Sequence, residues 1–333
     1  MPDTGEKILM VLVTGEFILG ILLNGFIAMV NCIDWVRSKT LSTSDLILVG
    51  LAISRIGLLC VIMWNSYLFI NGLYVATTDR VRIVDILLML MHNSSIWFAT
   101  VLSIFYFLKI ANFSNPLFLW MKWRINRIIY MLLGGPLIIS FFLGFPMMER
   151  MYYYASNLSR ERERNVSQEV QENKTMLIMF QLLFSLLGLI PFALTLVSLS
   201  LFNFSLWRHT QQMQLNATGS RDPNIEAHVR AMKTMSSFLI LFLLYHIGFF
   251  LNYWSYVLGK SKMLSILGIS VMLLYPFGHS LILIPWNSKL RKVVLRLWWK
   301  TRCYQKGSHL QVLLMLLRTI WHFLRRQKSG WSP

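Results

Sequence analysis

Residues 46–70, LILVGLAISRIGLLCVIMWNSYLFI, decide the fold class, because Arg55 is the one charged residue in this long and mostly apolar stretch. An α-helix rises about 1.5 Å per residue and needs about 20 apolar residues to cross the hydrocarbon of a bilayer. The stretch is longer than that, and its apolar residues fall on every face of a helix. We therefore predict a membrane-spanning helix here.

The rest of the chain repeats this pattern, since 56% of its 333 residues are hydrophobic and only 14% are charged. Inside a bilayer only helices and closed barrels satisfy the backbone hydrogen bonds, and the alternating pattern of a barrel is missing from the sequence. The sequence therefore predicts an all-α membrane protein with a seven-transmembrane helix bundle over residues 8–286. The predicted spans are residues 8–33, 46–70, 85–110, 128–148, 176–207, 236–258 and 264–286.

Short segments flank the predicted bundle at both ends. Residues 1–7 precede the run at 8–33, which is interpreted as the first span because it lacks the small-residue cleavage site of a secretory signal. Residues 287–333 form a basic tail in which Leu and Trp alternate with Arg and Lys. We predict two amphipathic helices there, at 289–303 and 310–327, lying on membrane lipid at the inner leaflet. An eighth span is the alternative.

The excess of Lys and Arg falls on one side of the predicted bundle. That side holds 21 Lys and Arg against four acids, whereas the other side holds 10 against eight. Cytoplasmic loops carry such an excess, so we predict a multi-pass protein of the plasma membrane with an extracellular N-terminus. Topology and anionic lipid explain the charge, and no nucleic-acid partner is predicted. The basic segments are 34–45, 109–127, 208–235 and 287–333.

Three glycosylation sites are predicted in the loop at 149–175, which this topology places outside the cell. The loop holds Asn-x-Ser/Thr triplets at Asn157, Asn165 and Asn173. Oligosaccharide is added to such triplets where they are exposed on the lumenal side. A further triplet at Asn216 lies in a predicted cytoplasmic loop and is therefore expected to stay unmodified.

Four polar residues within the predicted spans are expected to form one network. They are Asn24 in the first span, Arg55 in the second, and His279 and Ser280 in the seventh. An ionisable group in hydrocarbon costs about 2.5 kcal/mol or more, so such groups usually face the interior of the bundle and pair there. We interpret the network as structural, with direct participation in switching as the alternative.

Motifs of enzymes are missing from the sequence. It contains no Ser-His-Asp set, no intramembrane pair of acids and no helical His-Glu zinc motif, so the chain is not predicted to be an enzyme. The three cysteines and seven histidines show no metal-ligand spacing, and neither a metal nor a cofactor is expected. A transporter or channel subunit stays an alternative, although the repeats typical of transporters are not visible.

Five stretches carry a resemblance to a known family. Together they closely resemble the bitter taste receptors, the type 2 taste receptors, from about residue 8 to about residue 300. Departures from the family pattern occur at Leu88, where many members have Trp, and at the unusual pair Pro285-Trp286. The stretches read GEFILGILLNGFIAMVNCIDW (15–35), LILVGLAISRIGLLCVI (46–62), WFATVLSIFYFLKIANFSNPLFLWMKWRI (97–125), RHTQQMQLNATGSRDPNIEAHVRAMK (208–233) and HSLILIPWNSKLRK (279–292).

The resemblance implies a G-protein-coupled chemosensory receptor. A bitter small molecule is expected to bind in the outer half of the bundle and to activate a heterotrimeric G protein of the gustducin type. A vomeronasal pheromone receptor is the nearer alternative, and the oligomeric state stays open. The candidate ligand-binding residues are Trp64, His92, Asn93, Phe180, Phe184, Tyr245, Phe249 and Met272. The candidate residues for G-protein coupling are Tyr106, Lys109, His209, His228 and Lys233.

Overall fold

The computed structural model describes the part of the chain in which the helices lie. Several predicted features fall outside it: Phe180, Phe184, His209, Asn165, Asn173, the side chains of Asn157 and His228, and residues 310–327. The described residues are 4–40, 42–71, 79–111, 115–161, 179, 182, 185–186, 188–205, 207, 223–257 and 262–302.

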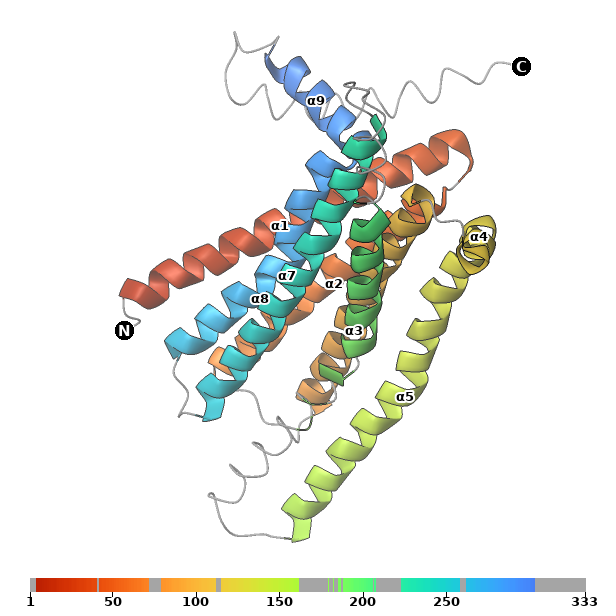
Figure 1. The fold of residues 1–333 in the computed structure, drawn as a ribbon. Helices are drawn as coiled ribbons and strands as arrows, with labels where there is room; N and C mark the ends of the chain where they lie inside the picture. The colour runs from red at the N-terminus through yellow and green to blue at the C-terminus, as the bar shows by residue number, and fades with distance from the viewer. Residues whose placement is uncertain are drawn as a thin grey trace, which may run out of the picture.

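The described residues form helices joined by short connections, and no strand occurs among them (Figure 1). Six of these helices are long and apolar enough to cross a membrane, which agrees with a helical membrane bundle: α1, α2, α3, the helix over Gly188–Ser205, α7 and α8. The fourth predicted span, 128–148, lies within α5, and its crossing of the membrane stays a prediction. The bounds are α1 Thr4–Ser38, α2 Thr43–Ile70, α3 Asp79–Ile110, α4 Pro116–Trp123, α5 Ile125–Glu161, α7 Pro223–Val257, α8 Lys262–Trp286 and α9 Ser288–Arg302.

Helix α8 holds a central place in the packing, since it contacts α1, α2 and α7 (Figure 1). Helix α2 packs in turn between α1 and α3. Most side chains that face inward are apolar, and Ile27, Leu58, Ile96 and Leu273 are among the fully buried ones. This arrangement places residues from α1, α2, α3, α7 and α8 around a shared interior.

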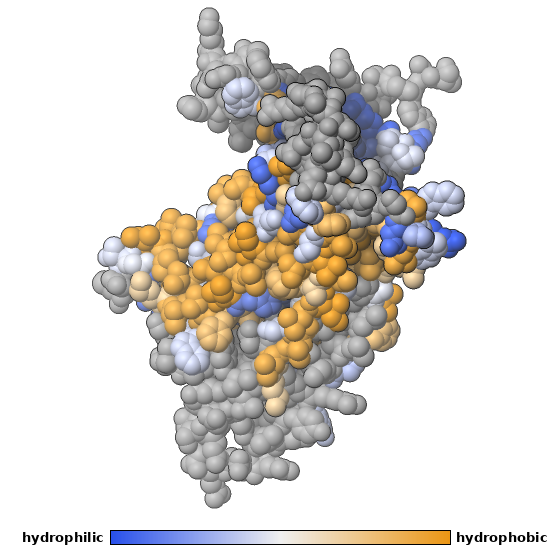
Figure 2. Space-filling model, viewed as in Figure 1, coloured by the Kyte–Doolittle hydropathy of each residue, from blue (hydrophilic) through white to orange (hydrophobic). Residues whose placement is uncertain are grey.

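Large apolar side chains also cover the outside of the bundle. Leu22 is 61% exposed and Ile240 is 59% exposed, and hydrophobic residues form a broad band across one face of the molecule (Figure 2). A soluble monomer rarely exposes apolar patches of this extent, whereas hydrocarbon is their natural surrounding. The band therefore fits a lipid-facing surface.

Helices α7 and α8 touch backbone to backbone at a pair of glycines. A Cβ atom added to Gly248 would lie 2.7 Å from the carbonyl oxygen of Gly268, and one added to Gly268 would lie 2.7 Å from the amide nitrogen of Asn252. Small residues allow such close approach, which is a common way for membrane helices to associate. The contact lies in the half of α7 that is nearer to its C-terminal end.

Side-chain caps start the two helices at the basic end of the molecule. Asn115 accepts a hydrogen bond from the amide of Leu117 at 2.8 Å, directly before α4. Asn287 accepts bonds from the amides of Lys289 at 3.0 Å and Leu290 at 3.1 Å, and α9 begins at the next residue. Such caps satisfy amides that the helix itself leaves open. The cap formed by Asn287 starts a new helix, α9, directly after α8.

Candidate functional site

Aromatic rings from α3, α7 and α8 meet inside the bundle. The rings of His92 and Tyr245 stack with their centroids 4.4 Å apart. The ring of His246 stands edge-on to His92 at 5.8 Å, and that of Tyr275 stands edge-on to Tyr245 at 5.7 Å. We call these four residues the ring cluster. It combines large apolar surfaces with polar ring atoms in a space shielded from water.

Three further predicted ligand-binding residues lie near the ring cluster, whereas Trp64 does not. Phe249 stacks on Tyr245 at 6.4 Å, and Met272 belongs to the same buried core. Asn93 is buried next to His92. Trp64 points elsewhere: its side chain is 57% exposed and contacts the ring of Tyr67 at 6.2 Å. The rotation of α2 about its own axis decides whether Trp64 faces the bundle interior, and residue type alone does not reveal this rotation.

The sequence did not single out His246 and Tyr275, although both belong to the ring cluster. His246 lies within the mostly apolar run at 236–258, and a histidine there is a signal for a residue that faces the bundle interior. Tyr275 precedes Pro276 and carries a hydroxyl group that lies 3.1 Å from Ser95 Oγ. Only the packing of α7 against α3 and α8 shows that His246 meets His92 and that Tyr275 meets Tyr245.

The four polar residues expected to pair are placed in one hydrogen-bonded network. Arg55 is fully buried, and its Nη1 donates to Ser280 Oγ at 3.1 Å while its Nη2 lies 2.7 Å from His279 Nδ1. Ser280 donates to Asn24 Oδ1 at 2.7 Å, and Asn24 donates to the carbonyl of Pro276 at 3.1 Å. These bonds tie α1 and α2 to α8 in the centre of the bundle.

Tyr275 connects the ring cluster to this network. The guanidinium carbon of Arg55 lies 5.4 Å from the centroid of the Tyr275 ring, and Phe238 on α7 contacts both Tyr275 and His279. A cation over a desolvated ring is stabilised by about 2 kcal/mol or more. The interior therefore holds a continuous set of contacts from His92 to Arg55.

Asp85 is a further buried polar residue that the sequence prediction missed. Its carboxylate accepts hydrogen bonds from the hydroxyl of Tyr152 and from Asn65 Nδ2, the latter at 3.1 Å. These contacts join α3 to α5 and α2. An acid at the border of a predicted span was the available signal, but its partners lie on two other helices and could not be named from the sequence.

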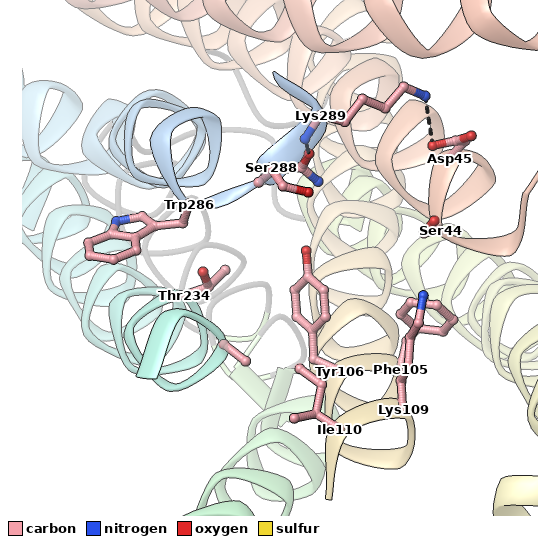
Figure 3. Close-up of a pocket in the computed structure, with 12 residues that line it drawn as sticks. Ser44, Asp45, Phe105, Tyr106, Lys109, Ile110, Thr234, Trp286, Ser288 and Lys289 are labelled. Atoms are coloured by element: carbon pink, nitrogen blue, oxygen red, sulfur yellow. Dashed lines mark hydrogen bonds and ion pairs between the residues drawn. The ribbon is translucent and has the colours of Figure 1, made fainter. Parts of the chain in front are cut away.

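A cavity of about 370 Å³ opens at the opposite end of the bundle, where α9 begins (Figure 3). We call it the inner pocket. The coupling candidates Tyr106 and Lys109 line it from α3, and Lys109 Nζ lies 5.2 Å from the ring centroid of Phe105. Lys233 stands beside it, with Nζ 4.6 Å from the ring centroid of Trp286. The lining residues of the other helices are Ser44, Asp45, Ala231, Thr234, Trp286, Asn287, Ser288 and Lys289.

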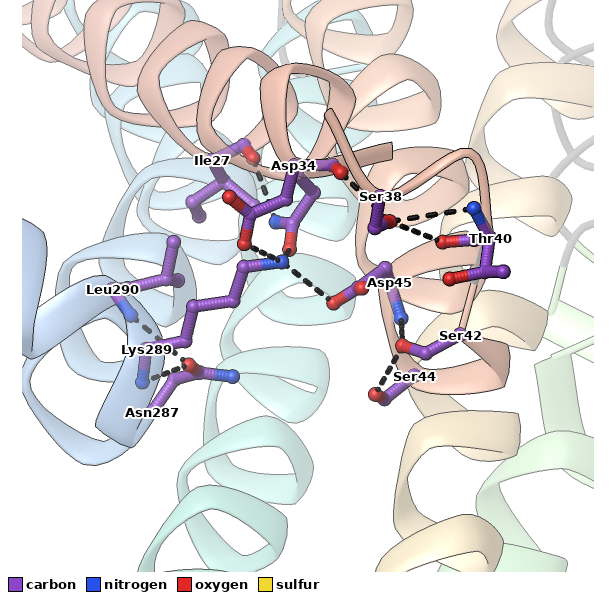
Figure 4. A network of polar contacts seen from close by, with 11 residues as sticks. Ile27, Asp34, Ser38, Thr40, Ser42, Ser44, Asp45, Asn287, Lys289 and Leu290 are labelled. Carbon is purple, nitrogen blue, oxygen red and sulfur yellow. Dashed lines mark hydrogen bonds and ion pairs between the residues drawn. The ribbon is translucent and has the colours of Figure 1, made fainter. Parts of the chain in front are cut away.

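One lysine joins α9 to α1 and α2 at the edge of the inner pocket (Figure 4). Lys289 Nζ lies 2.9 Å from Asp34 Oδ2, 2.9 Å from Asp45 Oδ1 and 3.0 Å from Asn31 Oδ1. Burial lowers the pKa of Lys289, but hydrogen bonds and charges of Asp34 and Asp45 more than offset this, so the pKa is raised. The contacts therefore stabilise the fold below the ordinary lysine pKa of about 10.4 and are lost only as pH rises through the raised value.

Lys289→Met is expected to loosen α9 from the bundle, because it removes the cation that Asp34 and Asp45 share. Backbone amides of α9 should exchange with solvent about tenfold faster, as hydrogen–deuterium exchange of the purified protein would measure. Lys292→Met, which removes an exposed lysine of the same helix, serves as the control. Equal exchange in both variants would show that Lys289 does not hold α9 in place.

A family model and several known proteins match most of this chain. A family model described as "Taste receptor protein (TAS2R)" matches residues 1–302. Taste receptor type 2 member 7 of Pongo pygmaeus is 44% identical over 314 residues, which cover 93% of this chain and 98% of the relative. Taste receptor type 2 member 8 of Homo sapiens is 42% identical over 299 residues, which cover 89% and 97%. The resemblance noted in the sequence is confirmed, and the chain belongs to the type 2 taste receptor family, a family of receptors and not of enzymes.

Proposed function

We propose that the chain is a G-protein-coupled receptor for bitter small molecules that activates a heterotrimeric G protein of the gustducin type. One observation carries the proposal: the ring cluster and the inner pocket lie at different depths of the same helices, α3, α7 and α8. These helices can adopt two arrangements, and a ligand that binds more tightly to one of them raises the population of that arrangement. The other site then changes shape as well, because the same helices form it. Family membership supports this function over the vomeronasal receptor and transporter alternatives.

The proposed topology has seven spans, with α5 as the fourth and the N-terminus outside the cell. The positive-inside rule supports it, because described residues of the basic segments, among them Lys109 and Lys289, line the inner pocket. The proposal places this side in the cytoplasm and the chain in the plasma membrane. On this topology His92 and Tyr245 lie in the outer halves of their helices.

The proposed ligand site surrounds the ring cluster. Small-molecule sites are mostly apolar and carry a few polar groups that fix the orientation of the ligand. Tyr245, Phe249 and Met272 supply apolar walls from α7 and α8, and His92 and Asn93 supply polar groups from α3. The exposed Trp64 has no part in this wall.

The inner pocket is the proposed site of G-protein coupling. It collects polar and aromatic groups from α2, α3, α7, α8 and α9, so its shape depends on how all these helices are arranged. Tyr106 and Lys109 are the proposed contacts on α3. A binding partner that fits the pocket only after the helices shift would link ligand binding to signalling.

The function is tested by expressing the receptor with a gustducin-type chimeric G protein and measuring calcium release with a panel of bitter compounds. A concentration-dependent response of the wild-type receptor is expected. His92→Ala should raise the half-maximal concentration about tenfold or more, because it removes one ring of a stack and a polar group from the site. If the well-expressed wild-type receptor released no calcium with any compound of the panel, the proposed function would be rejected.

Ser94→Ala is the matched control for the ligand site. Ser94 follows His92 by two residues on the same helix, and its hydroxyl bonds the carbonyl of Leu90 within that helix at 2.7 Å. Its removal is expected to leave the response close to that of the wild type. If His92→Ala behaved like Ser94→Ala, the ligand would have to bind away from the ring cluster.

A further inference from the structure

Among the contacts that hold α7 against α8, two lie near opposite ends of their interface. At the outer level the backbones touch at Gly248 and Gly268, where no side chain separates them. At the inner level Lys233 of α7 places its ammonium group over the ring of Trp286, the last residue of α8, at 4.6 Å. The glycine contact lets the two backbones pack tightly at the outer level, whereas at the inner level the two helices meet through the side chains of Lys233 and Trp286.

The inner contact lies beside the inner pocket. Ala231 and Thr234 of α7 line one wall, and Trp286 with the residues that follow it lines another. Figure 3 shows Trp286 and Thr234 on neighbouring helices at the same side of this cavity. The shape of the pocket on this side therefore depends on the distance between α7 and the end of α8. A separation of these two helix ends would lengthen the contact of Lys233 with Trp286.

We propose that Trp286 acts as a brake on coupling: its contact with Lys233 keeps the inner end of α7 against α8 and so keeps the inner pocket narrow in the resting receptor. The inference rests on the proposed function, because it assumes that a G protein enters this pocket. It assigns a role to Trp286, the last residue of α8.

The chemistry of the contact sets the size of the effect. Lys233 is exposed and Trp286 is half-buried, so the cation lies over the ring in contact with water. The attraction within such a pair changes the equilibrium constant between two states only a few-fold. The brake therefore restrains the resting receptor without preventing activation by a bound ligand.

The test measures basal nucleotide exchange by the G protein in membranes that contain equal amounts of receptor. Trp286→Leu keeps an apolar side chain but removes the ring, and it is expected to raise basal exchange about two- to fivefold. It should also lower the half-maximal concentration of any active bitter compound by a similar factor. Trp286→Phe keeps a weaker ring and should give an intermediate rise.

A double-variant cycle shows whether Trp286 acts through Lys233. Lys233→Gln alone should raise basal exchange, and adding it to Trp286→Leu should produce no further rise, since the contact is already lost. Lys292→Gln, which removes an exposed charge from α9, controls for a general effect of charge. Additive effects of the two substitutions would overturn the assignment to this pair.

The outcomes separate the brake from the proposed function. A wild-type receptor that responds to bitter compounds, together with an unchanged or lower basal exchange in Trp286→Leu, would overturn the brake and leave the function intact. If Trp286→Leu lowered basal nucleotide exchange and also weakened the response to bitter compounds, Trp286 would promote coupling and the proposed brake would be wrong. A wild-type receptor that activates no G protein in the presence of the panel would reject the function itself.

Discussion

Gly248→Ala is expected to destabilise the receptor strongly, because the added methyl group would lie 2.7 Å from the backbone of α8. A clash with a flexible side chain can be relieved by a rotation, but here the nearest atoms are the Gly268 carbonyl oxygen and the Met272 amide nitrogen. The two helices must therefore move apart along their contact. Overpacking of this kind costs about 1–3 kcal/mol, and a backbone clash belongs at the upper end of that range.

The measurement is the temperature at which the detergent-solubilised receptor loses its monomer peak in size-exclusion chromatography. Gly248→Ala should lower this temperature by about 5 °C or more. Gly25→Ala on α1 is the matched control, because a Cβ atom there meets nothing within 4 Å. Equal melting of the two variants would mean that α7 and α8 pack less closely than the structure indicates.

Arg55→Ala is expected to have the second large effect, on both the yield of folded receptor and the response to ligand. The substitution empties a fully buried site and takes a donor from Ser280 and a partner from His279. Large-to-small substitutions of buried residues cost about 2–5 kcal/mol. The loss should reach the ring cluster as well, because Tyr275 contacts the guanidinium group.

Thermal stability and surface yield of four variants test this expectation: Arg55→Ala, Ser280→Ala, the combination of both, and a control. Ser54→Ala is the control, since Ser54 precedes Arg55, is also buried, and donates its hydroxyl hydrogen bond to the carbonyl of Leu51 in its own helix. It should change stability by less than about 1 kcal/mol. Combining Arg55→Ala with Ser280→Ala should cost less than the sum of the two single changes, since the residues are direct partners. Strict additivity would contradict the network.

The helices themselves could be predicted from the sequence, because the thickness of the bilayer sets how long an apolar run must be. The runs predicted to end at residues 70, 110 and 286 end there in α2, α3 and α8. The helices begin before the predicted spans do. Helix α7 begins at Pro223 although its apolar run begins near residue 236, because backbone hydrogen bonds continue a helix beyond the hydrocarbon.

The candidate sites could be predicted only in part. Polarity within an apolar run marked Asn24, Arg55 and His92 as inward-facing residues, and all three are buried. The same reasoning had no means to place Trp64, since a helix that is apolar on all faces does not reveal which face meets lipid. His246 and Asp85 were missed because their importance depends on the neighbours that other helices supply.

The sequence by itself determined that the chain is a bundle of membrane helices and which family it resembles, since both follow from composition and from local order of residues. Only the tertiary structure determined which residues of different helices contact one another. Lys289 meets Asp45 across 244 positions of the chain, and Ser280 meets Asn24 across 256. Such contacts depend on the crossing and rotation of whole helices, which are set by side-chain packing along their full length. The inner pocket, the ring cluster and the contact of Lys233 with Trp286 exist only at that level.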